Sequence, residues 1–130
     1  MGDWSKNFNK SEFACPCCGK FIQHNSLVDM LQVIRDEVKS PIKINSGTRC
    51  LKYNNSLSGS SNNSGHLTGE SADIYISGWD NQRLYIFLKE LYKVGKIQKL
   101  TYCYKIVGKT NTAVHVGIDK KNRKSIWGSG

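Results

Sequence analysis

The sequence has no apolar run that approaches the roughly 18 residues of a membrane-spanning helix. Its beginning, MGDWSKNFNK, also lacks the basic start and apolar stretch that are typical of a secretory signal. We therefore expect a chain without a membrane span that is cytoplasmic at synthesis, which leaves open where the protein acts.

Acidic residues are scarce, with 10 Asp and Glu against 19 Lys and Arg and a formal net charge of +9. This excess favours an acidic polymer as partner, a class that includes nucleic acid, anionic lipid and the bacterial cell wall. The 130 residues are too few for two ordinary domains and show neither an internal repeat nor a dividing linker. We therefore expect one domain over residues 1–130.

The five cysteines are an odd number, and they lack the second close pair that a zinc ribbon needs. Cys15, Cys17 and Cys18 crowd into CPCCGK, whereas Cys50 and Cys103 stand alone. Neighbouring thiols are hard to pair with one another. One interpretation is a set of reduced thiols, some of them buried as small apolar groups. The other is a small structural metal site, or one bridge from the cluster to Cys50.

Two segments show the apolar spacing of amphipathic helices. The first has Ser26 as its expected N-cap, stops at Ser40-Pro41, and carries its apolar side chains at Leu27, Met30, Leu31, Ile34 and Val38. The second follows Asp80 as N-cap, ends before Gly95, and carries its apolar side chains at Leu84, Phe87, Leu88 and Leu91.

Four short segments are predicted strands, namely PIKIN, ADIYIS, LTYCYKIV and AVHVGID. Between the first two lies YNNSLSGSSNNSG, whose composition cannot pack a core and predicts a long surface loop. Together with the two helices, these strands predict a small α+β domain. We expect an antiparallel sheet with helices packed on one face and polar side chains on the other.

Alternation along two of these strands brings an aspartate and a histidine to the same side. Asp73 lies opposite the apolar residues of ADIYIS, and His115 lies opposite those of AVHVGID. If the strands are neighbours with their apolar faces toward the helices, both side chains emerge on the other face of the sheet. His66 can join them because Gly69 permits a turn before Asp73.

Two imidazoles and one carboxylate would suit zinc at a catalytic site whose fourth position is open. A histidine in a small protein is, however, more often a surface or hydrogen-bonding residue. From the residues alone, both interpretations of His66, Asp73 and His115 stay open.

A longer motif carries a family resemblance. The pattern S-x-H-x-x-G-x-x-A-D, followed by the HV of AVHVGID, consists of Ser64, His66, Gly69, Ala72 and Asp73. It resembles the zinc D-alanyl-D-alanine carboxypeptidase family, which includes vancomycin-resistance dipeptidases and phage endolysins and shares its fold with the hedgehog signalling domain. NFNKSEFACPCCG, INSGTRC and the Asn-bearing loop are similar to the small, phage-type branch. The resemblance therefore covers nearly the whole chain.

The resemblance implies a role for five residues. His66, Asp73 and His115 would hold zinc. Arg49, in SGTR, would stabilise the oxyanion that develops on the scissile carbonyl, because a guanidinium is permanently charged and offers a fork of donors. Ser64 would help to bind the terminal carboxylate of the substrate.

The general base is not identified. Family members often carry an acid three residues before the final histidine or two residues after it, where this sequence has Thr112 and Gly117. Asp119 shares the face of His115 but lies on the order of 13 Å away along a straight strand. Glu70, inside the motif, is more typical of a solvated loop charge.

The sequence thus predicts a monomeric, zinc-dependent peptidoglycan peptidase of the carboxypeptidase or endopeptidase type, in the manner of a phage endolysin that reaches the cell wall after release. The alternative is a catalytically weak or inactive wall-binding module or phage tail component that keeps the fold and the zinc. A third interpretation, nucleic-acid binding, rests on lysines among tyrosines near the C-terminal half, but no nucleic-acid motif accompanies them. The bond cut and the host are not specified by the sequence.

Overall fold

The computed structural model describes residues 7–15, 18–19, 21–22, 24–48, 50, 69–106, 111–118 and 126–127. The elements follow one another as η1 (Lys10–Phe13), α1 (Asn25–Val38), β1 (Ile42–Ser46), β2 (Ser71–Ile76), α3 (Asn81–Lys93), β3 (Tyr102–Lys105) and β4 (Val114–Gly117). The loop predicted in YNNSLSGSSNNSG lies outside the described residues. All four predicted strands are present.

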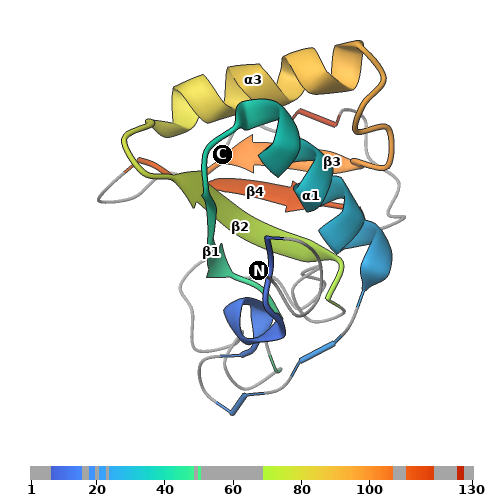
Figure 1. Cartoon of the computed structure of the whole chain (residues 1–130), viewed down its shortest axis with the longest axis vertical. Coiled ribbons are helices and arrows are strands. Elements are labelled where there is room, and N and C mark those ends of the chain that lie inside the picture. Colours follow the sequence, from blue (N-terminus) through green and yellow to red (C-terminus); the bar gives the residue numbers. More distant parts are fainter. Residues whose placement is uncertain are drawn as a thin grey trace.

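The described strands form an antiparallel sheet in the order β1-β2-β4-β3. In Figure 1, α3 lies along the top beside β3, α1 passes in front of the strands, and η1 lies at the opposite end of the view from α3. A hydrophobic core joins both helices to one face of the sheet, to which the strands contribute Ile42, Ala72, Ile74, Ile76, Cys103, Val114 and Val116. The predicted α+β fold with helices on one face is confirmed.

The first helix begins earlier than the sequence predicts. Its N-cap is His24, and the predicted cap, Ser26, lies inside the first turn. The backbone explains the difference, because the carbonyl of His24 already accepts hydrogen bonds from the amides of Leu27 and Val28. The helix ends at Lys39, whose φ of 57° closes it with a left-handed residue.

The second helix has the predicted boundaries. The carboxylate of Asp80 accepts a hydrogen bond from the amide of Arg83 at 2.8 Å and so caps the first turn of α3. Beyond the helix, Gly95 has a φ of 85°, a conformation that favours glycine. Within the described residues, neither helix is long and apolar enough to cross a membrane.

The N-terminal segment is fastened to the end of β1 by its backbone. Phe13 is buried in the core, and its carbonyl accepts a hydrogen bond from the amide of Thr48 at 2.7 Å. Gly47 allows this approach, because a Cβ at that position would lie 2.6 Å from the Cα of Phe13. The residues on either side of Arg49 are therefore held against the segment that leads to Cys15.

Replacing Gly47 with Ala is expected to destabilise the protein by about 1–3 kcal/mol, because the added methyl group meets backbone atoms that cannot rotate away. Urea unfolding followed by circular dichroism measures the loss. Asn45→Ala, at an exposed position of β1 two residues before Gly47, is the matched control and should change stability by less than about 0.5 kcal/mol. Equal effects of the two substitutions would contradict the close approach at Gly47.

Candidate active site

Asp73 and His115 meet on the face of the sheet that points away from the helices. β2 and β4 are antiparallel neighbours, and these two residues are direct partners in their register. The Oδ1 atom of Asp73 lies 2.9 Å from the Nδ1 atom of His115, with the two residues 6% and 7% exposed. The predicted convergence of the aspartate and the histidine is therefore confirmed.

Local alternation explains why both side chains point this way. Ala72 and Ile74 flank Asp73 and enter the core, while Val114 and Val116 do the same on either side of His115. One detail differs from simple alternation, which predicts one buried and one exposed face for ADIYIS. Residues 71–74 of β2 are all buried, so side chains on both faces of this part of the strand are covered.

Asp73 and His115 are neighbours across β2 and β4, and this row of side chains continues onto β3. There, two tyrosines contact the imidazole of His115. Tyr104 is the register partner of His115, and its ring stacks on the imidazole with centroids 4.7 Å apart and planes 16° apart. Tyr102 meets the same imidazole edge to face at 6.2 Å. Our sequence reasoning missed both tyrosines. Alternation in LTYCYKIV was the available signal, since it puts Tyr102 and Tyr104 opposite the buried Cys103.

A crowded polar corner lies beside this row, where Ser71 pairs with Gly117. The Ser71 hydroxyl is buried and has no hydrogen-bond partner among the described residues. A Cβ at position 117 would lie 2.8 Å from that oxygen and 3.7 Å from the Nε2 atom of His115. A larger residue at position 117 therefore requires the Ser71 hydroxyl to move, whereas its Cβ would make only ordinary contact with the His115 imidazole.

Three predicted site residues, Arg49, Ser64 and His66, lie outside the described residues, as does Asp119. The structure does fix Thr48 and Gly69, the two flanks of the segment that carries all three of Arg49, Ser64 and His66. The Thr48 hydroxyl accepts a hydrogen bond from the amide of Ile22 at 3.1 Å. On the other flank, a Cβ at Gly69 would lie 2.8 Å from the carbonyl oxygen of Ile22. Thr48 and Gly69 are thus both held against Ile22 of the N-terminal segment.

The turn predicted at Gly69 is confirmed, since this residue has a φ of 75°. The β-strand begins two residues later at Ser71. A left-handed glycine at this point lets the chain change direction between position 66 and Asp73, as the alternation argument required. Glu70, the residue between turn and strand, is half-buried, and its carbonyl accepts a hydrogen bond from the amide of Ile118 at 2.9 Å.

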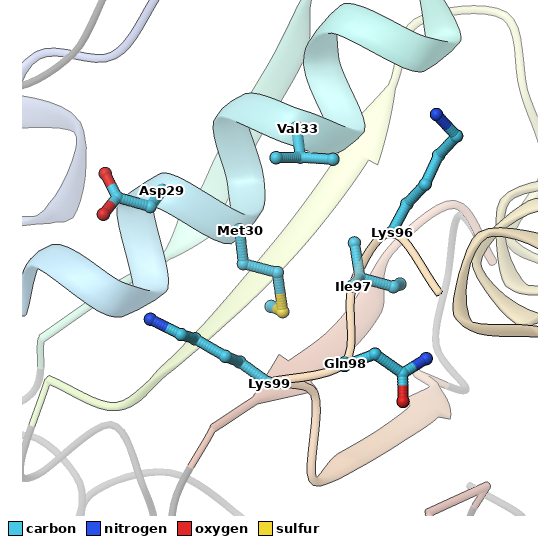
Figure 2. Close-up of a pocket in the computed structure, with 7 residues that line it drawn as sticks. All are labelled: Asp29, Met30, Val33, Lys96, Ile97, Gln98 and Lys99. Carbon is cyan, nitrogen blue, oxygen red and sulfur yellow. The ribbon is translucent and has the colours of Figure 1, made fainter. Parts of the chain in front are cut away.

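A pocket lies elsewhere, on the helical side of the molecule (Figure 2). Met30 points into it from α1 toward the segment after α3, and the full lining is Asp29, Met30, Val33, Lys96, Ile97, Gln98 and Lys99. The side chains that line this pocket include one carboxylate and two ammonium groups, but no imidazole, thiol or hydroxyl group. This pocket is therefore separate from the Asp73–His115 pair, which lies on the opposite face of the sheet.

The Asp73 and His115 donors fit a zinc ion. Zinc binds carboxylate oxygen and imidazole nitrogen at about 2.0–2.2 Å, so two such donors on a tetrahedral ion lie about 3.3 Å apart. The Oδ1 and Nδ1 atoms, 2.9 Å apart, need to separate by a few tenths of an ångström to accept the ion. Burial on a rigid pair of central strands holds both donors in place.

The corner at Gly117 yields a stability prediction. Gly117→Ala is expected to cost about 1–3 kcal/mol through overpacking against the Ser71 hydroxyl. In a Ser71→Ala background the same change should cost less than half as much, because the crowded oxygen is gone. Urea unfolding of the wild type, both single variants and the double variant measures this coupling as a double-mutant cycle. Additive effects would show that the two positions do not touch.

Comparison with known proteins gives the family. The family model described as Peptidase M15 matches residues 6–117 of the sequence, which include the motif around His66 and the strand that ends at Gly117. No curated protein matches the sequence. Because the family match covers most of the chain, and because the paired aspartate and histidine fit zinc, the protein belongs to the peptidase M15 family of zinc-dependent metallopeptidases.

Proposed function

We propose that the protein is a zinc-dependent peptidoglycan peptidase that cuts at or near D-alanine in the stem peptides of the bacterial cell wall. The observation that carries the proposal is the buried Asp73–His115 pair at 2.9 Å within a chain of the peptidase M15 family. The net charge of +9 supports attraction to the anionic polymers of the wall.

His66, Asp73 and His115 are proposed to hold the zinc ion. When bound, zinc polarises the scissile carbonyl and makes water a nucleophile near neutral pH. Asp73 would supply a carboxylate oxygen and His115 an imidazole nitrogen to that ion. Tyr104, stacked on the imidazole, limits rotation of the His115 ring and so keeps its nitrogens aligned before metal arrives.

Arg49 and Ser64 are proposed to handle the substrate. The guanidinium of Arg49 stabilises negative charge as it develops on the carbonyl oxygen, and the hydroxyl of Ser64 binds the terminal carboxylate. The position of Arg49 in the sequence supports this role, because it lies between Thr48 and Cys50, which both contact the N-terminal segment. The backbone on each side of the arginine is thus anchored.

The proposed active site has no identified general base. Thr112 and Gly117 occupy the two positions at which relatives carry an acid, and neither can accept a proton as a carboxylate would. A positioned general base typically contributes about 10²- to 10⁴-fold. We therefore propose a slow enzyme that acts as a monomer on the wall after release from the cytoplasm, in the manner of a phage endolysin.

The zinc ligands are tested by metal content. His115→Ala is expected to lower the zinc content of protein purified without chelator by one equivalent per chain, because a ligand is lost from a site of three. Mass spectrometry of the bound metals measures this. His24→Asn is the matched control, since it also removes an imidazole but keeps a residue suited to a helix N-cap. Unchanged zinc in His115→Ala would contradict the ligand assignment.

Turnover is tested on purified peptidoglycan by counting new amino groups and released D-alanine. We expect slow activity that zinc chelation abolishes, a loss of about 10²-fold or more in Arg49→Ala, and a loss of less than about tenfold in Asp119→Ala. Arg83→Ala, an exposed arginine on α3, controls for the change in net charge.

Two results would redirect the proposal. Zinc-loaded protein that binds wall fragments but shows no turnover at any pH would favour the wall-binding module over the enzyme. A collapse of activity in Asp119→Ala, with metal and fold intact, would identify Asp119 as the general base.

A further inference from the structure

Three cysteine thiols come together at the end of the molecule that holds the N-terminal segment. Cys15 and Cys18 follow η1, and Cys50 follows β1. The Sγ atoms of Cys15 and Cys50 lie 3.8 Å apart, and all three sulfur atoms lie within 4.8 Å of one another. None of the three contributes to the proposed peptidase mechanism.

The spacing of the sulfur atoms matches a metal site. Zinc–thiolate bonds of about 2.3 Å around a tetrahedral ion place neighbouring sulfur atoms about 3.8 Å apart. A disulfide would need about 2.05 Å, and it would use two of the thiols and leave the third without a role. The separation of 3.8 Å between the Cys15 and Cys50 sulfur atoms, which are in hydrogen-bond contact, therefore matches the spacing of two ligands on one ion.

The local backbone supports the same conclusion. Cys15 and Cys18 have the C-x₂-C spacing that is typical of structural zinc ligands. The carbonyl of Cys15 accepts a hydrogen bond from the amide of Gly19 at 2.7 Å, and Gly19 has a φ of 76°, which closes a tight turn. The amide of Cys50 donates to the Cys15 sulfur at 3.5 Å, an interaction that stabilises a thiolate.

We propose that Cys15, Cys18 and Cys50 bind a second, structural zinc ion. Burial of Cys15, at 2% exposure, secures the inner ligand, and the exposed Cys18 lets water reach the remaining position. The ion joins segments 35 residues apart, so it reinforces the backbone contact between Phe13 and Thr48. It thereby fixes the chain immediately after Arg49.

Metal content separates this site from the peptidase site. Wild-type protein purified under reducing conditions without chelator is expected to carry two zinc ions per chain. Cys18→Ser should carry one fewer and remain folded, since the side chain is exposed, whereas His115→Ala should lose the other ion. Cys103→Ala is the matched control, because it removes a cysteine of β3 outside the cluster and should retain both ions.

Cobalt provides a readout that depends on sulfur alone. Protein reconstituted with Co²⁺ is expected to show thiolate-to-cobalt charge-transfer absorption in the near ultraviolet. The absorption should disappear in Cys18→Ser and persist in both His115→Ala and Cys103→Ala. It persists even if the proposed peptidase function fails, because the ligands at the two sites are different.

Burial also raises the pKa of the Cys103 thiol, so this cysteine should stay unreactive in the folded chain. Thiol titration should then find that bound zinc protects Cys15, Cys18 and Cys50, and that chelation of the zinc exposes these three thiols. The proposal is overturned if wild-type protein shows no thiolate–cobalt absorption. It is equally overturned if non-reduced protein has a mass lower by two hydrogens and a Cys15–Cys50 disulfide in its peptide map.

Discussion

The pairing of β2 with β4 is the constraint on which the candidate site depends. These strands are far apart in sequence, yet their antiparallel register makes Asp73 and His115 direct partners. The apolar residues on either side of each donor in the sequence pack in the core and anchor both strands to α1 and α3. A shift of one residue in the register of either strand would turn the donor on that strand toward the core, so the hydrophobic pattern positions the site residues as well as the fold.

A second set of contacts organises the chain around the sheet. Ile22 meets Thr48 through a hydrogen bond and Gly69 through close backbone packing, while Phe13 accepts a hydrogen bond from Thr48. These contacts hold together the N-terminal segment, the end of β1 and the start of β2. Cys15, Cys18 and Cys50 lie close together in the same part of the molecule. A metal ion bound by them would add coordination bonds to these hydrogen bonds and packing contacts.

The two proposed metal sites would use different ligand chemistry for different tasks. Nitrogen and oxygen donors around Asp73 and His115 leave an ion electrophilic and able to activate a carbonyl. Thiolates donate more charge to the ion and are typical ligands of structural sites. Tyr104 contributes to the first of these sites, because its ring stacks on the His115 imidazole and covers one face of that ring.

Much of this protein follows from local patterns in the sequence. Alternation in ADIYIS and AVHVGID determined which faces Asp73 and His115 occupy, and the helix signals at Asp80 and Gly95 set the ends of α3, because periodicity and capping are local properties. The tertiary structure alone decided that β2 lies beside β4, that Tyr104 stacks on His115, and that Cys15 approaches Cys50. Each of these contacts joins distant segments whose meeting depends on how a shared core packs, which no local pattern encodes.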